Sequence, residues 1–175
     1  TVAHACTALS APLGTYSING NHDWWDDEKA QKRMKGPTLT EQVFTEAGIQ
    51  MLVNDATRLE KDGRPFWLSG TDSLVAVKTR RPGVFYGRDD IEGTLKKVTH
   101  DAPIIHMAQE PDLFINMPDR VSLTLSGHTH GGQVRLFGYS PIVPSSFGNR
   151  FAWGHIIEDG RHLVVSGGLG CSILP

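Results

Sequence analysis

The sequence predicts an α/β layered fold with a mixed β-sheet and a functional site in the loops at the strand ends. Apolar, strand-like runs alternate with a few helical segments, which is typical of layered α/β folds. Polar loops that begin with glycine follow two of these runs, at 20–23 and 127–133. Hairpin signals at Asp62-Gly63 and Asp159-Gly160 add antiparallel pairs, so the sheet is expected to be mixed.

The first half of the chain is expected to hold few helices. Its predicted elements are the end of an amphipathic helix over 2–9, a strand over 14–19, a helix over 39–47 and a hairpin over 56–60 and 65–69. The helix over 39–47 has clear end signals, because Thr38 and Glu41 fit a capping box at its start and Gly48 provides a stop.

The second half of the chain adds further expected elements. Its predicted elements are a mobile basic loop over 78–90, a helix near 90–98, buried strands over 102–108 and 121–126, and a hairpin over 154–158 and 162–166. No internal repeat or low-complexity segment is visible in the sequence.

The composition is that of a globular protein. The 175 residues suit one domain, with 39% hydrophobic and 21% charged residues. The formal net charge is -2, so binding of nucleic acid through bulk charge is not expected. No apolar run approaches the length of about 18 residues that a membrane span needs.

The chain ends and the two cysteines leave several questions open. The sequence begins with Thr1 and stops after Pro175, and both ends are expected to be cuts through a longer protein. Cys6 and Cys171 allow a disulfide but do not require one. The compartment stays undetermined: cytoplasmic, or membrane-peripheral or exported if a preceding segment carries an anchor or signal.

His128 and His130 form the first candidate metal-binding pair. In an extended segment, residues two apart project to the same side, so both imidazoles would reach one ion or two neighbouring ions. Imidazole suits zinc, iron and manganese-type centres. The alternative is a pair of surface or hydrogen-bonding histidines. The glycines around this pair and the preceding buried strand favour the metal site.

Asn21, His22 and Asp23 form the second candidate group. The amide oxygen of Asn21 can ligate a metal, and a carboxylate such as Asp23 can fix the charge and tautomer of His22. His22 would then act as a general acid toward a leaving oxygen. The alternative is a turn that caps the next element.

The two motifs together resemble motifs of the calcineurin-like metallophosphoesterases. The segments Gly20 to Asp23 and Gly127 to Gln133 carry the resemblance, and Trp24-Trp25, Glu110-Pro111-Asp112 and the tail Ser166 to Cys171 extend it toward a bacterial branch of predicted phosphohydrolases. The resemblance covers nearly the whole chain. It implies a partial four-layer αββα sandwich and makes residues 1–175 the C-terminal portion of one metallophosphoesterase domain.

The resemblance also implies roles for individual residues. Asn21 and His128 would ligate one metal ion and His130 the other, with manganese, zinc or iron as the expected metals. His22 would protonate the leaving oxygen, with Asp23 orienting it. Hydrolysis would follow two-metal chemistry.

The sequence departs from the family pattern in two places. The upstream Asp-x-His and Gly-Asp-x-x-Asp motifs are absent from these 175 residues, and Gln109 stands where the family has a histidine ligand. His106 is a doubtful substitute, because in a strand it faces away from Gln109, and it is expected to be packed near the sheet. We therefore expect weak metal binding and little or no turnover by this chain alone.

Weaker candidates lie near these motifs. Trp24 and Trp25 could line the substrate entrance, but the simpler interpretation is that one packs in the core and the other is a partly exposed rim residue. The basic side chains of Lys78, Arg80, Arg81 and Arg88 could attract an anionic phosphate or lipid headgroup, with Arg80 and Arg81 as candidate substrate-binding residues, although a solvated loop is the simpler interpretation.

The expected function is metal-dependent hydrolysis of a phosphoester, with phosphodiesters as the default substrate. The alternatives are a UDP-sugar lipid pyrophosphohydrolase, for which an apolar groove beside the site is expected, and an inactive metal-binding or interaction remnant. Self-association is expected through surfaces that truncation exposes. Membrane association is expected only through a missing N-terminal segment.

Overall fold

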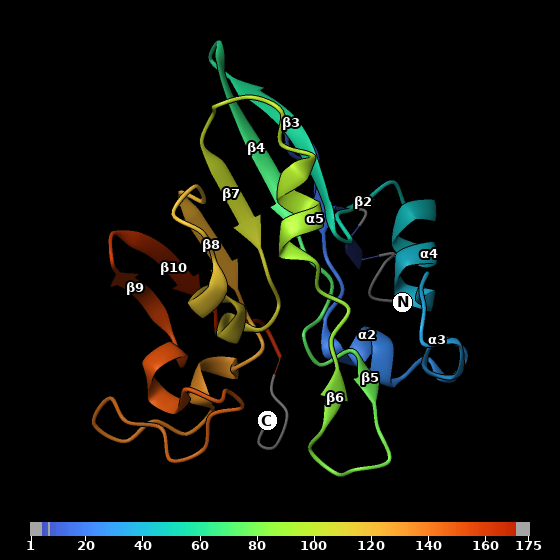
Figure 1. Ribbon diagram of the computed structural model, residues 1–175, viewed down its shortest axis with the longest axis vertical. Helices are drawn as coiled ribbons and strands as arrows, with labels where there is room; N and C mark the ends of the chain where they lie inside the picture. Colours follow the sequence, from blue (N-terminus) through green and yellow to red (C-terminus); the bar gives the residue numbers. More distant parts are fainter. Residues whose placement is uncertain (1–4, 7, 171–175) are drawn as a thin grey trace.

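A six-stranded mixed sheet forms the centre of the molecule (Figure 1). The computed structural model describes residues 5–6 and 8–170. The strand order is β3-β4-β7-β8-β10-β9, and the pairs β4–β7, β7–β8 and β8–β10 are parallel. The strands are β3 (Asp55–Lys61), β4 (Arg64–Gly70), β7 (Ile104–Met107), β8 (Leu123–Ser126), β9 (Gly154–Glu158) and β10 (Arg161–Val165). The predicted mixed α/β fold is confirmed.

Shorter elements surround this sheet. The strand pairs are the parallel pair β1 (Tyr16–Ser17) and β2 (Gln50–Met51) and the antiparallel pair β5 (Val77–Lys78) and β6 (Phe85–Tyr86). The helices are α2 (Asn21–Trp25), α3 (Glu28–Arg33), α4 (Leu39–Glu46) and α5 (Ile91–Lys96), with 3-10 turns η1 (Pro111–Asn116), η2 (His130–Gly132) and η3 (Gly148–Phe151).

The main core lies on one face of the large sheet. Trp67, Ile104 and Leu163 point from three strands into a cluster with Phe114 of η1 and Phe151 of η3. The partly buried apolar residues of α5 pack against the same cluster. Alternate residues of each strand supply this face, as the two-residue period of a strand requires.

The opposite face of the sheet is also apolar but only half-buried. The register places Leu68, Ile105, Leu125 and Val164 on this face. The pair β1–β2 covers one end of it, because a Cβ added at Gly70 would collide with Ile18 and Leu52. This second, smaller layer agrees with the expected αββα sandwich. Self-association through the half-buried face stays a prediction.

The local sequence signals agree well with the structure. Thr38 caps α4 through the backbone N–H of Glu41 at 3.1 Å, and the Glu41 carboxylate accepts from the Thr38 N–H at 3.1 Å. Gly48 follows with a φ of +80°. Both predicted hairpins are present, as β3–β4 and β9–β10.

Other expectations need correction. The basic loop over 78–90 contains the β5–β6 hairpin, since the Thr79 hydroxyl donates to the Val84 carbonyl at 2.8 Å and closes its tip. Helices α2 and α3 were not predicted, because each has fewer than seven residues. Most of the predicted helix end over 2–9, and Cys171 of the suggested disulfide, lie outside the described residues. Among the residues that the structure covers, no helix is long and apolar enough to span a membrane.

Candidate metal centre and cavity

Three loops that follow strands meet at one end of the large sheet. The loop after β1 begins at Gly20, the loop after β7 contains Gln109, and the loop after β8 begins at Gly127. The Gly127 N–H donates to the Gln109 carbonyl at 3.1 Å. A Cβ at Gly20 would lie 3.1 Å from the Gln109 amide carbon, so a small residue is needed for these loops to close together.

Asn21 and His128 are in direct contact at this meeting point. Nδ1 of His128 lies 3.2 Å from Oδ1 of Asn21, although the two residues are 107 positions apart in sequence. Asn21 is buried, and both residues line one cavity. Burial lowers the pKa of His128, and the Asp112 carboxylate partly opposes this shift. The neutral imidazole, which is the metal-ligating form, is therefore favoured.

His128 and His130 converge for a different reason from the one that the sequence indicated. The segment is not extended: the two residues have φ values of 67° and 50°, with Thr129 in the right-handed helical region between them. The Thr129 hydroxyl fixes the turn by donating to the Ala152 carbonyl at 2.7 Å. Nδ1 of His130 lies 3.1 Å from the Gly170 carbonyl. Both imidazoles nevertheless line the same cavity.

His22 is paired with a carboxylate other than the expected one. Asp23 accepts the Gly20 N–H at 2.7 Å and so caps the start of α2. One turn later, Asp26 places a carboxylate oxygen 3.5 Å from Nδ1 of His22. The expected orienting contact between Asp23 and His22 is thus wrong, because the cap directs Asp23 toward the backbone. His22 itself lines the cavity with an exposed side chain.

The cavity has a volume of about 1040 Å³ and mostly apolar walls. Phe85 of β6 and Trp25 of α2 stack on one side with ring centroids 5.2 Å apart, and Val134 and Ile142 lie in a loop on the other side. Trp24 is fully buried, while Trp25 is half-buried at the cavity wall. The prediction that one tryptophan packs in the core and the other is partly exposed is confirmed, and a role at a substrate entrance stays a prediction.

Two acidic residues near the candidate ligands support the surrounding loops. Glu110 is buried and accepts the Ser73 hydroxyl at 2.7 Å and the Leu74 N–H at 2.9 Å. Its burial raises the pKa of the Glu110 carboxyl to about 7. Asp112 accepts from the hydroxyl of Ser145 and from the N–H of Ser146. The sequence pointed to this segment only through the family resemblance.

His106 has the structural role that the sequence predicted. It is fully buried in β7, with Nδ1 2.9 Å from the Ser69 hydroxyl and Nε2 3.4 Å from the Thr71 hydroxyl. Burial lowers its pKa to about 4, so the ring is neutral at pH 7.

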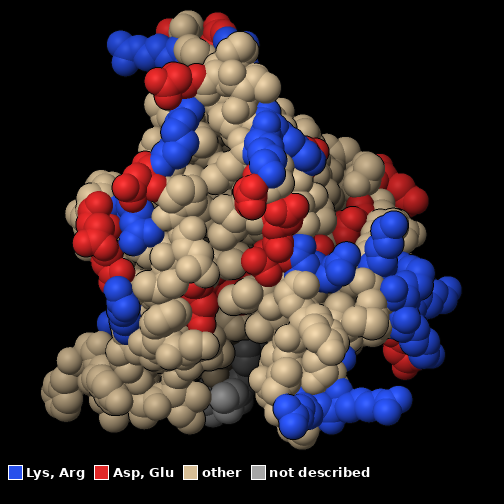
Figure 2. Space-filling view, viewed as in Figure 1, with Lys and Arg blue, Asp and Glu red and all other residues tan. Residues whose placement is uncertain are grey.

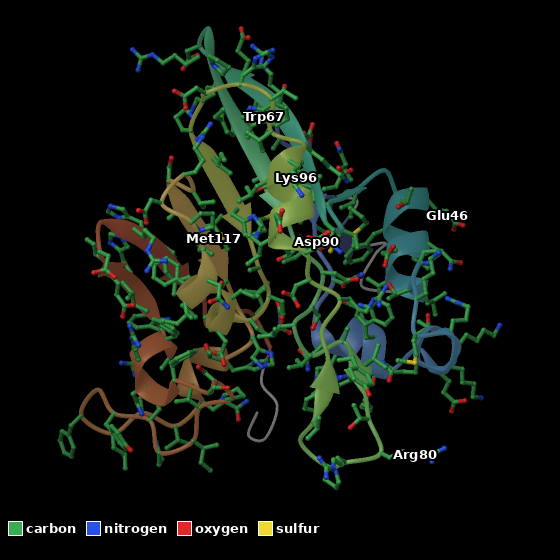
Figure 3. The ribbon with its side chains drawn as sticks, viewed as in Figure 1. Glu46, Trp67, Arg80, Asp90, Lys96 and Met117 are labelled. Carbon is green, nitrogen blue, oxygen red and sulfur yellow. The ribbon has the colours of Figure 1, made fainter. Side chains whose placement is uncertain are left out.

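Arg80 and Arg81 do not line the cavity. They lie at the tip of the β5–β6 hairpin, and Figure 3 shows Arg80 pointing away from the molecule. Direct contact of Arg80 or Arg81 with a substrate in the cavity is therefore not supported by the geometry, and attraction of an anionic group by this loop stays a prediction.

The donor set suits only part of a metal site. Asn21, Gln109, His128 and His130 all border the cavity, and together they offer amide oxygens and imidazole nitrogens, which ligate borderline divalent ions. All of these donors are uncharged. Within the described ranges 5–6 and 8–170, no group of three or more His, Cys, Asp or Glu side chains is arranged to hold an ion. These residues therefore suit a divalent ion, but they supply only part of its ligand set.

Comparison with known proteins identifies homologues over nearly the whole chain, although no family model matches. YkuE of Bacillus subtilis, named an uncharacterized metallophosphoesterase, is 31% identical over 169 residues, covering 95% of this chain and 53% of the relative. Phosphodiesterase YaeI of Escherichia coli K12 is 31% identical over 161 residues, covering 89% and 51%. A bovine transmembrane protein with a metallophosphoesterase domain is 30% identical over 173 residues, covering 95% and 36%.

These relatives agree with the resemblance seen in the two motifs. The chain spans about half the length of the first two relatives, at 53% and 51%. The relatives come from bacteria and from animals, so the family is not restricted to the bacterial branch that the tail suggested. The sequence similarity to these proteins and the mixed α/β fold confirm the predicted resemblance of this chain to the calcineurin-like metallophosphoesterase superfamily.

Proposed function

We propose that this chain carries part of a dinuclear metal centre that hydrolyses phosphate esters, with phosphodiesters as the main substrates. The observation that supports this most directly is the contact between Asn21 and His128 at 3.2 Å. It joins the two motifs at the wall of a cavity large enough for a small phosphoester. The names of the relatives point to the same chemistry.

Asn21 and His128 would hold one ion, His130 would hold the other, and Gln109 would add a weak oxygen ligand. Bound divalent ions supply charge neutralisation for a phosphoryl group and lower the pKa of a coordinated water. Oδ1 of Asn21 lies 3.2 Å from Nδ1 of His128, so the two side chains are close enough to ligate one ion. Which metals are used is part of the proposal: manganese, zinc and iron suit these donors.

His22 would deliver a proton to the leaving oxygen. Asp26 lies 3.5 Å from Nδ1, so a protonated ring would donate to this carboxylate through Nδ1 and keep Nε2–H available for a leaving oxygen. Asp23 contributes indirectly by capping α2, the helix that carries both Asn21 and His22.

Metal binding by the isolated chain should be weak. The proposed ligands are neutral, so no ligand charge offsets the charge of a divalent ion, and carboxylate ligands strengthen such binding. Calorimetry with manganese or zinc should detect weak binding. Two tightly bound ions per isolated chain would show that the site is more complete than its described ligands.

The function is tested by manganese-dependent hydrolysis of a chromogenic aryl phosphodiester, beside a His128→Ala control. We expect a slow metal-dependent rate that disappears in the control. If the His128→Ala control keeps the metal-dependent rate, the reaction does not take place at this site. No metal-dependent rate, together with no metal binding, would favour the alternative of an inactive remnant, to which Gln109 also points.

The apolar walls of the cavity favour a second candidate, hydrolysis of a nucleotide-lipid pyrophosphate such as a UDP-sugar lipid. Trp25, Phe85 and Ile142 would accommodate an acyl chain beside the phosphoryl group. A lipid-linked pyrophosphate should then compete with the aryl phosphodiester better than its water-soluble nucleotide product does. Equal competition by both would remove the support for this candidate.

A further inference from the structure

Two loops extend past the candidate site on either side of its cavity. One is the tip of the β5–β6 hairpin, residues 79–84, and the other is the loop over 134–142 (Figure 1). Both project at the same end of the molecule, opposite to the β3–β4 hairpin tip. Gly83 of the first tip and the adjoining Phe85 of β6 line the cavity, as do Val134 and Ile142 of the second, so the two tips flank it.

The 134–142 loop presents large apolar side chains to solvent. The exposed fractions are 109% for Phe137, 69% for Ile142, and 62% for both Leu136 and Tyr139. Phe137 also has a φ of +51°, a backbone region that β-carbon-bearing residues rarely adopt. A strained, fully exposed phenylalanine breaks two local rules at once, and such positions tend to be functional.

The loop is held in this exposed arrangement by hydrogen bonds. The backbone groups of Leu136 and Tyr139 pair in both directions, at 2.8 and 3.0 Å. The Arg135 guanidinium donates to the Gly138 carbonyl at 3.1 Å, and the Asn149 amide donates to the Ser140 carbonyl at 2.6 Å. The apolar side chains are therefore presented on a braced turn.

The neighbouring hairpin tip is basic. Residues 76–88 contain Lys78, Arg80, Arg81 and Arg88 and no acidic residue, and residues 131–149 contain Arg135 and no acidic residue. The whole chain has a slight acidic excess, 19 acidic to 17 basic residues. Figure 2 shows the consequence: basic side chains gather over the hairpin tip, and no charged side chain is visible over the loop beside it.

We propose that these two tips dock the protein on an anionic lipid surface. The apolar side chains of the 134–142 loop would enter the boundary between headgroups and acyl chains, while Arg80 and Arg81 would contact anionic headgroups. This combination of apolar and basic side chains is complementary to such a surface. Since the tips flank the cavity, the docked protein would hold the candidate site against the membrane. Membrane association would thus not require a further N-terminal segment.

Sedimentation with lipid vesicles tests the proposal independently of any hydrolysis. The probes are vesicles of phosphatidylcholine alone and vesicles with an equal part of phosphatidylglycerol, at about 0.1 M salt. We expect binding to the anionic vesicles, a loss of about tenfold for Phe137→Ser, and a loss of about thirtyfold for the double variant Arg80→Ala/Arg81→Ala.

Matched control variants distinguish docking through the two tips from non-specific binding by exposed apolar or basic side chains elsewhere. Leu39→Ser removes an apolar side chain of 62% exposure from α4, and Arg64→Ala removes a basic one from the opposite end of the molecule. Both should bind the vesicles like the original chain. Unchanged unfolding midpoints for all variants would establish that the fold is intact. The proposal is overturned if the chain ignores anionic vesicles, if it binds neutral ones equally well, or if the tip variants bind like the controls.

Discussion

His106 and His128 come from neighbouring parallel strand segments but belong to different environments. His106 is within β7 and His128 is two residues beyond the end of β8, the parallel neighbour of β7. His106 is fully buried between the hydroxyls of Ser69 and Thr71. His128 contacts the Asn21 amide at the wall of a cavity. The position of a histidine relative to the strand end thus separates a core residue from a candidate ligand.

The largest expected effect follows from replacing the core histidine. His106→Ala should lower the free energy of unfolding by about 3 kcal/mol, because it leaves a cavity and deprives two buried hydroxyls of their partner. Urea denaturation measures this change. His100→Ala, at an exposed position, should cost less than about 0.5 kcal/mol. If both variants cost the same, His106 does not have the core role described.

Replacing His128 at the cavity wall should affect metal affinity more than stability. His128→Ala should weaken manganese binding on the order of 100-fold, equivalent to about 2.7 kcal/mol, because a proposed ligand is lost. Calorimetry measures the affinity, and urea denaturation should show a smaller loss of stability than for His106→Ala. If His106→Gln weakened manganese binding as much as His128→Ala does, the assignment of His128 rather than His106 as a ligand would be contradicted.

The free energy of unfolding should depend on pH because His106 is buried in its neutral form. Its pKa in the folded state is about 4, below the ordinary value of 6.5, so the stabilisation is present above pH 6.5 and is lost as the pH falls toward 4. Between pH 7 and pH 5 this loss should reach about 2 kcal/mol. Glu110, whose folded pKa is raised to about 7 by burial, acts in the opposite direction over the same range.

The contribution of His106 is isolated by comparison with His106→Asn, which keeps an amide for the two hydroxyls but does not titrate in this range. Urea denaturation at pH 7 and pH 5 should show that the original chain loses more stability than the variant by about 2 kcal/mol. Equal losses would mean that His106 is not held neutral by burial.

The smallest expected effect distinguishes the two aspartates around His22. Asp23→Ala should lower stability by about 1 kcal/mol, because the Gly20 N–H loses its cap. Asp26→Ala should change stability by less than about 0.5 kcal/mol, since its contact with His22 is at the surface. Thermal unfolding followed by circular dichroism would compare them. A larger loss for Asp26→Ala than for Asp23→Ala would contradict the assignment of Asp23 as the cap of α2 and of the Asp26 contact as a weak surface pair.

Local patterns predicted much of the fold. The capping box of Thr38 and Glu41 and the Asp-Gly turns at 62 and 159 depend on neighbouring residues, so the sequence displays them directly. The convergence of Asn21 and His128 could also be anticipated, because both follow strands whose ends lie at one edge of the fold.

The features that could not be predicted depend on contacts between distant segments. The turn at His128 is fixed by a bond from Thr129 to Ala152. Glu110 is buried because Ser73 and Leu74, more than 30 positions earlier, provide its donors. The exposed apolar loop that contains Phe137 is anchored at Ser140 by the Asn149 amide, nine positions later. None of these partners is recognisable from spacing within one segment.

A manganese titration of the 175-residue chain tests the central claim most directly, with Asn21→Ala, His128→Ala and His106→Gln measured beside it. The account predicts weak binding by the original chain, a clear loss in the first two variants, and an unchanged affinity in the third. Affinities that are the same in all four proteins, or lowest in His106→Gln, would contradict the assignment of Asn21 and His128 as metal ligands.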